Sequence, residues 1–100
     1  MTAQEAETLV REVLRENLGE PKSLLPLEAR LKEDLDFDEL DYIETAVLLE
    51  KKLADRNATT QWHGGFVPDL EVAGWLTIQD VILSALNLEA PEVTLVQSKT

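Results

Sequence analysis

The sequence predicts an all-α fold, a bundle of three main helices and one short helix with up-and-down connections and a long first loop. Two observations predict it. Apolar residues recur at the i, i+3, i+4 spacing of amphipathic helices within residues 3–18, 39–56 and 78–86. Helix-start and helix-stop signals bound these segments. The 100 residues, 44% of them hydrophobic, suffice for one domain with a small core.

The first helix is predicted over residues 3–18. Thr2 and Glu5 form a Thr-x-x-Glu capping box at its start. Gly19 supplies a residue that accepts a left-handed conformation after its end, and Pro21 prevents continuation. Between these signals the apolar positions follow the helical repeat: Ala6, Leu9, Val10, Val13, Leu14 and Leu18. We expect the opposite, charged face to be solvated.

Residues 20–37 are predicted to form a long connection. A loop of this length is unusual in a compact domain unless it packs its own side chains. We expect a short turn of helix around residues 27–31. Five leucines indicate that the loop packs against the bundle: Leu24, Leu25, Leu27, Leu31 and Leu35.

The second main helix is predicted from Glu39 to Leu53 or Arg56. Asp36 and Asp38 precede it, and an aspartate at the N-cap satisfies free backbone donors at a helix start. Three acidic residues then occupy the first turns, where the helix dipole favours negative charge: Glu39, Asp41 and Glu44. The apolar positions cover a broad arc: Leu40, Ile43, Ala46, Val47, Leu49 and Leu53. Such an arc can pack into a bundle and still offer apolar surface to a partner.

The rest of the chain is predicted to contain a loop, a short helix and the last main helix. Residues 57–67 are polar, have paired glycines and lack a helical repeat. Residues 68–72 start a short helix that Gly74 ends. Thr77 and Asp80 form a capping-box variant, and apolar residues follow it at helical spacing: Ile78, Val81, Ile82, Ala85 and Leu86. We assign residues 1–88 to one domain and 89–100 to a flexible tail.

The net charge limits which classes of partner the protein can bind. There are 20 acidic and 9 basic residues, which gives a formal charge of −11. This charge argues against nucleic acid and anionic membrane surfaces, and it favours a basic surface on a protein partner. The chain has no cysteine, a polar N-terminus unlike a signal peptide, and no run long enough to span a bilayer. We therefore expect a cytoplasmic location.

The segment 33–53 resembles the second helix of acyl carrier proteins, where a Gly-x-Asp-Ser-Leu motif opens the recognition helix. Asp38 matches the motif aspartate, and Leu40 and Asp41 match the Leu-Asp that follows. Residues 75–82 resemble the opening of the last helix in the same family, a Thr-(Val/Ile)-x-(Asp/Ala) pattern. The likeness covers about two-thirds of the chain and implies an acyl-carrier-like bundle.

The position that defines the family's activity differs. Where the family carries the serine that receives 4′-phosphopantetheine, this chain has Glu39. An alcohol that attacks the pyrophosphate of coenzyme A forms a stable phosphodiester, whereas a carboxylate would form a mixed anhydride that water cleaves. Glu39 still suits a helix start electrostatically. A second difference is Lys51-Lys52, where family members are commonly acidic; the lysines either complement the helix C-terminus or alter the partner-binding face.

The leading hypothesis is a protein-interaction module without catalytic activity, metal or cofactor, which binds a carrier-dependent enzyme of fatty-acid or polyketide type metabolism. We expect it to be a monomer. The resemblance implies that four acidic residues of the second helix meet basic residues of the partner: Asp38, Asp41, Glu44 and Glu50. It implies that Ile43 and Val47 supply the apolar contact between them.

Two alternatives remain open. The chain would be a genuine carrier of 4′-phosphopantetheine if an unconventional residue were loaded, but Ser23, Ser84 and Ser98 all lack an Asp-Ser-Leu context. It would be a small fatty-acid-binding module if a lipid lay non-covalently between the helices. Three aromatic residues would then line the cavity or contact the ligand, although capping of the core also explains them: Trp62, Phe66 and Trp75.

Metal binding and catalysis are not predicted. Asp34, Asp36 and Asp38 imitate the first ligands of a calcium loop, but Glu39 and Thr45 occupy the positions that require glycine and glutamate. His63 is a lone histidine with no cysteine or second histidine to complete a metal site. The paired carboxylates at the helix start lack a companion base or hydroxyl, so acid–base catalysis is not expected.

Overall fold

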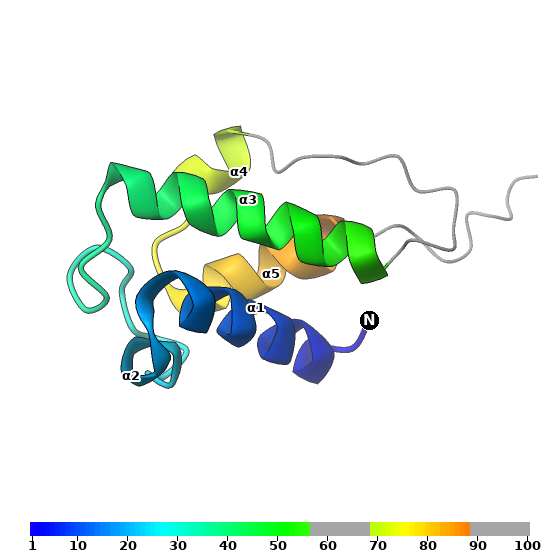
Figure 1. Ribbon diagram of the computed structural model, residues 1–100, viewed down its shortest axis with the longest axis horizontal. Helices are drawn as coiled ribbons and strands as arrows, with labels where there is room; N and C mark the ends of the chain where they lie inside the picture. Colours follow the sequence, from blue (N-terminus) through cyan, green and yellow to red (C-terminus); the bar gives the residue numbers. More distant parts are fainter. Residues whose placement is uncertain (57–68, 89–100) are drawn as a thin grey trace, which may run out of the picture.

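The computed structural model describes residues 1–56 and 69–88, which form five helices and no strand (Figure 1). The helices are α1 (Ala3–Leu18), α2 (Glu20–Ser23), α3 (Glu39–Arg56), α4 (Asp69–Ala73) and α5 (Ile78–Leu88). Because α1 packs against α2, α3 and α5, it is the central helix of the bundle. The predicted all-α class is confirmed, and so are the starts of the three main helices.

Local capping explains where two of these helices begin. The Thr2 hydroxyl accepts a hydrogen bond from the Glu5 backbone N–H at 3.1 Å, and the Glu5 carboxylate accepts one from the Thr2 N–H at 2.8 Å. Before α5, the Asp80 carboxylate likewise accepts from the Thr77 N–H at 3.0 Å, while the Thr77 hydroxyl accepts from the Asp80 N–H at 3.3 Å. Both predicted capping boxes are therefore present.

The first loop differs from the prediction in two places. Pro21 lies in the first turn of α2, where its missing N–H costs nothing, so the chain forms a short helix where only a loop was expected. Residues 27–31 do not form the expected turn of helix. Their backbone groups pair instead with the entrance of α5: Leu31 N–H with Leu76 O at 2.9 Å, Ile78 N–H with Ala29 O at 3.1 Å, and Gln79 N–H with Leu27 O at 3.0 Å.

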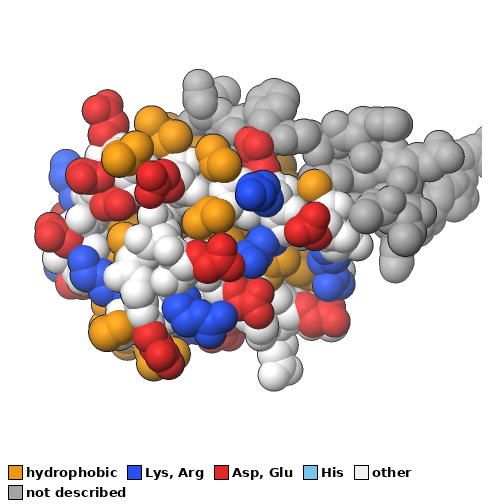
Figure 2. Space-filling model, viewed as in Figure 1, with side chains coloured by type: hydrophobic (Ala, Val, Ile, Leu, Met, Phe, Trp, Pro, Cys, Tyr) orange, Lys and Arg blue, Asp and Glu red, His pale blue; other side chains and the backbone are white. Residues whose placement is uncertain are grey.

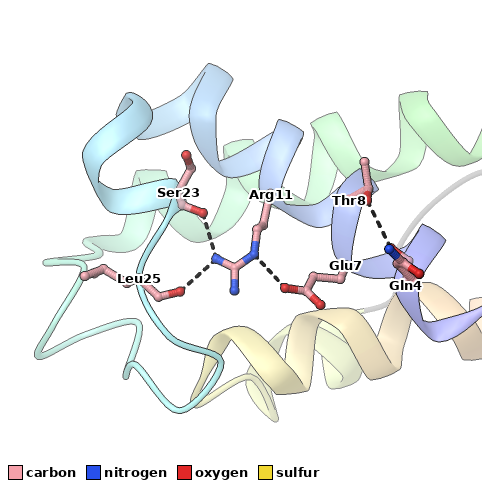
Figure 3. A network of polar contacts seen from close by, with 6 residues as sticks. All are labelled: Gln4, Glu7, Thr8, Arg11, Ser23 and Leu25. Atoms are coloured by element: carbon pink, nitrogen blue, oxygen red, sulfur yellow. Dashed lines mark hydrogen bonds and ion pairs between the residues drawn. The ribbon is translucent and has the colours of Figure 1, made fainter.

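Two cations of the N-terminal region hold this loop against the bundle. The Arg11 guanidinium donates to the backbone carbonyls of Ser23 at 2.8 Å and Leu25 at 2.7 Å, and its Nε donates to Glu7 at 2.9 Å (Figure 3). The Lys22 ammonium donates to the Leu35 carbonyl at 3.0 Å. Side chains of α1 and α2 therefore satisfy three backbone carbonyls of this segment.

One hydrophobic core joins the long helices and the first loop. Trp75 belongs to it and donates its indole N–H to the Ser84 hydroxyl at 2.7 Å; that hydroxyl donates to the Glu71 carboxylate at 2.6 Å. The largest fully buried apolar side chains come from α1, the loop, α3 and α5: Leu14, Leu31, Leu35, Leu49, Leu53 and Ile78. The expectation that the loop packs its own leucines is confirmed for Leu31 and Leu35. None of the described helices has the length and apolar content to cross a bilayer.

Replacing Arg11 by methionine should destabilise the protein by about 1–3 kcal/mol, because two loop carbonyls lose their donor while most of the packed stem is kept. Urea unfolding followed by circular dichroism measures this difference. Arg15→Met is the matched control, since Arg15 is exposed on the same helix. Equal midpoints for the two variants would show that the Arg11 contacts do not stabilise the loop.

Candidate functional site

The N-terminus of α3 is closed by two aspartates that cap each other's backbone. The Asp38 carboxylate accepts from the Asp41 N–H at 2.9 Å, and the Asp41 carboxylate accepts from the Asp38 N–H at 2.9 Å. This is a capping box built from aspartates. Asp38 is thus the predicted N-cap, and one oxygen of each carboxylate is engaged inside the protein.

A sharp turn delivers Asp38 to this position. Asp36 has a φ of 61°, a left-handed conformation that aspartate tolerates better than most residues, and it lies where the Gly-x-Asp-Ser-Leu motif has its glycine. The next residue, Phe37, is buried, and its N–H donates to the Leu31 carbonyl at 2.9 Å. Its ring meets Tyr42 edge to face, with centroids 4.9 Å apart. Burial, assisted by the charge of Glu33, raises the pKa of the Tyr42 hydroxyl.

Glu39 is the first residue of α3 and is exposed. Within residues 1–56 and 69–88 its carboxylate makes no hydrogen bond or ion pair with another side chain. The capping hydrogen bonds at this helix start are made by Asp38 and Asp41, so Glu39 contributes its charge to the helix dipole and no capping hydrogen bond. Its side chain therefore stands free at the position of the family's attachment serine.

The apolar arc of α3 divides into two faces. Ala46, Leu49 and Leu53 are buried against the bundle. Leu40, Ile43 and Val47 are 58%, 56% and 47% exposed and follow one another at three- and four-residue spacing. Figure 2 shows apolar side chains gathered over α3, with acidic groups among them. Ile43 and Val47 of this exposed stripe are the apolar residues that the sequence predicts for a partner contact.

The predicted partner-binding residues are only partly brought together. Ile43, Glu44 and Val47 lie on the exposed face, and Asp38 is exposed at its N-terminal end. Asp41 and Glu50 are half-buried at its sides. The structure adds Leu40, which the sequence did not assign to this face, and it places Lys51 there, for which the sequence left the choice between the helix C-terminus and this face open. Their spacing of seven and four residues from Val47 is the signal that identifies them.

The structure separates the adjacent lysines of α3. Lys52 turns towards α1, where its ammonium lies 2.7 Å from the Glu16 carboxylate and 3.9 Å from that of Glu12. The hydrogen bond from Lys52, followed by its charge, lowers the pKa of Glu16, and the same hydrogen bond raises the pKa of Lys52. Lys51 is exposed beside Val47. One lysine therefore clamps two helices, and the other belongs to the outer face.

The described serines are closed to modification. Ser23 and Ser84 are 2% and 3% exposed. The Ser23 hydroxyl donates to the Glu20 carbonyl at 2.7 Å, and the Ser84 hydroxyl is held between Trp75 and Glu71. Of the other residues considered for loading or ligand contact, four lie outside the described residues: Trp62, His63, Phe66 and Ser98.

Two further features lie away from Glu39. An open groove of about 790 Å³ lies between the start of α1 and the end of α3. Its lining residues include Thr8, Leu9, Lys52 and Arg56. None of the residues assigned to a site from the sequence lines it.

Among the described residues no group of three or more histidine or acidic side chains is arranged to hold a metal ion. The Asp34 carboxylate instead accepts from the Arg30 N–H at 2.7 Å.

Comparison with known proteins gives one consistent result. The chain is 33% identical over 95 residues to the meromycolate extension acyl carrier proteins of Mycobacterium leprae and Mycobacterium tuberculosis. The match covers 92% of this chain and 73% of each relative. No family model matches the chain, and no solved structure matches it.

The clamp between α1 and α3 should make stability depend on pH. Because the folded pKa of Glu16 is lowered, the ion pair stabilises the protein above the ordinary value of 4.5 and is lost as the pH falls through the lowered pKa. Wild type should therefore be more stable than Glu16→Gln at pH 7, and the difference should shrink below pH 4.5. Urea unfolding across this range measures it, with Glu28→Gln as an exposed control. A difference that persists unchanged at low pH would contradict the role of the pair.

Proposed function

The chain belongs to the acyl carrier protein family, and from that premise we propose that it is a non-phosphopantetheinylated interaction module that binds a carrier-dependent enzyme through α3. The observation that carries this proposal is Glu39. Its free carboxylate occupies the exposed first position of α3, where the family's serine receives the prosthetic group. The helix start is intact, so the recognition element is kept while the attachment chemistry is absent.

The chemistry of a carboxylate supports the absence of a stable cofactor bond. Attack by the Glu39 oxygen on the β-phosphorus of coenzyme A would form an acyl phosphate and release adenosine 3′,5′-bisphosphate. An acyl phosphate is a mixed anhydride, and an exposed one at a helix start is open to water. The two serines that the structure describes are buried and hydrogen-bonded, so neither is a replacement nucleophile. The protein would therefore act by association and not by carrying an acyl group or by catalysis.

The shape of the α3 face supports a partner with a basic rim around an apolar contact. Ile43 and Val47 form the apolar centre together with Leu40. Asp38, Glu44 and, at the sides, Asp41 and Glu50 supply the negative charge. Because Asp38 and Asp41 each keep one carboxylate oxygen outside the capping box, they can cap the helix and still meet a cation. We propose that a monomer in the cytoplasm presents this face.

The relatives support a class of partner. Their name assigns them to meromycolate extension and calls them acyl carrier proteins. We propose that the partner is an enzyme of acyl-chain metabolism that binds carrier domains. A module that occupies such a docking surface without delivering a substrate would regulate or position that enzyme.

Incubation with coenzyme A and a promiscuous phosphopantetheinyl transferase tests the loss of the attachment site. We expect the intact mass of wild type to stay unchanged, because no accessible alcohol stands at the start of α3. The Glu39→Ser variant should gain one phosphopantetheine, since Asp38 and Leu40 already supply the context of the motif. A mass gain in wild type would overturn the proposal and support a carrier loaded elsewhere in the chain.

The rate at which the same transferase loads the Glu39→Ser variant measures how well the transferase docks to α3. In the Glu39→Ser background, Glu44→Lys should lower kcat/KM for loading by about tenfold, because a lysine would oppose a basic docking surface. Glu28→Lys changes the net charge equally on an exposed loop residue and is the control. If both reversals have the same small effect, overall charge and not the α3 face determines docking.

A further inference from the structure

We propose that Lys51 is a specificity-determining residue of the α3 face, and that it opposes docking by enzymes whose docking surface is basic along the whole helix. The partner is then an enzyme whose surface is basic opposite Asp38 and Glu44 and not basic opposite Lys51. This inference deepens the proposed function and rests on it, because it concerns which carrier-dependent enzyme the face accepts.

The three basic residues of α3 lie in different surroundings. Lys52 turns towards α1, where its ammonium lies 2.7 Å from the Glu16 carboxylate. Arg56 is the basic residue of the last turn and lies 3.3 Å from the Glu5 carboxylate. Lys51 is exposed and makes no hydrogen bond or ion pair with the residues that the structure describes. Two of the three cations are therefore engaged with α1, and the third is open to another molecule.

Neither the helix end nor the clamp accounts for Lys51. The helix dipole acts on charges in the last turn, and Lys51 lies five residues before Arg56, where α3 ends. The charge of Lys51 does lower the pKa of Glu16, but as a weaker cause than Lys52 and Arg15. We therefore assign the charge of Lys51 to the outer face of the helix.

Lys51 lies on the same side of α3 as the predicted partner contact. It follows Val47 by four residues and Glu44 by seven, and these intervals keep side chains on one side of a helix. All three residues are exposed. Two helical turns, about 10 Å along the axis, separate Glu44 from Lys51, so the two charges do not pair. The face therefore changes sign along its length, from negative at Asp38 and Glu44 to positive at Lys51.

Two acidic residues lie close to Lys51 in the chain, and neither neutralises it. Glu50 is half-buried at the side of the face. Asp55 lines the groove between α1 and α3. Within residues 1–56 and 69–88, Lys51 makes no ion pair with either of them. A basic side chain of a partner that approaches Glu50 along this face therefore also meets the ammonium of Lys51.

Repulsion between like charges is a general means of rejecting wrong partners. A docking surface that supplies cations along the whole of α3 gains attraction at Asp38 and Glu44 and loses part of it at Lys51. A surface that is basic only opposite the first two residues gains the same attraction without this loss. Lys51 therefore favours the second kind of enzyme over the first.

Loading of the Glu39→Ser variant by the promiscuous phosphopantetheinyl transferase tests this role of Lys51. Position 39 lies 12 residues before Lys51, about 18 Å along the helix axis, so a change at Lys51 does not touch the reacting hydroxyl. In this background Lys51→Glu should raise kcat/KM by about fivefold through a lower KM, and Lys51→Gln by about twofold. Both gains should shrink with added salt, because the screening length falls from about 10 Å at 0.1 M to about 3 Å at 1 M.

Lys32→Glu in the same background is the matched control, since it makes the same change in net charge on an exposed residue of the first loop. It should leave kcat/KM nearly unchanged. The midpoint of urea unfolding should not change with either lysine variant, because neither lysine forms an ion pair within the described part of the chain.

Equal kcat/KM values for the Lys51→Glu and Lys32→Glu variants would overturn the role of Lys51. A gain that appears in kcat alone, or that persists unchanged at high salt, would overturn it as well. Loading of wild type would instead overturn the proposed loss of the cofactor. The comparison of the lysine variants would still hold, because loading is followed on the peptide that contains position 39.

Discussion

The backbone pairing between the first loop and the entrance of α5 is the constraint on which the rest of this small bundle depends. Residues 27–31 give their carbonyls and N–H groups to residues 76–79, far away in the sequence. This pairing satisfies free donors at the start of α5 and lets Leu31 and Leu35 enter the core without leaving backbone groups unpaired. Arg11 donates to the carbonyls of Ser23 and Leu25, and Lys22 donates to that of Leu35. The loop that leads to α3 is thereby fixed in place.

The position of α3 then decides what the protein presents to others. The turn at Asp36 buries Phe37 and brings Asp38 into the capping box with Asp41. Since these neighbours make the capping hydrogen bonds, Glu39 is not needed for capping. On the inner side, Thr45 and Leu49 are buried, and Asn17 donates to the Thr45 hydroxyl at 3.0 Å. The outer side keeps an apolar stripe in an acidic surround, which suits association better than chemistry.

Signals that are local in sequence predicted the fold well, and contacts between distant segments account for what they missed. The capping boxes at Thr2 and Thr77 each need only four residues, so they place α1 and α5 correctly. Pro21 was interpreted as a stop signal alone, although proline also suits the first turn of a new helix. The helix expected at residues 27–31 is absent because pairing with α5 outweighs local propensity.

The candidate site was predictable where its residues are neighbours in the sequence, and not where it depends on contacts between distant segments. The matched motif located Asp38, Glu39 and the acidic helix start, because these residues are adjacent in the chain. Which of Lys51 and Lys52 faces outward depends on where Glu16 of α1 lies, and the sequence does not contain that placement. Leu40 belonged to a single apolar arc in the sequence, but packing against α1 divides that arc and leaves Leu40 outside.

The intact mass of the protein isolated from its own cells shows directly whether a cofactor is attached, because the natural loading enzymes are present there. We expect the mass of the unmodified polypeptide in every fraction, with Glu39 unaltered in the peptide that spans the start of α3. A population that carries phosphopantetheine on any residue would contradict it and identify the protein as a working carrier.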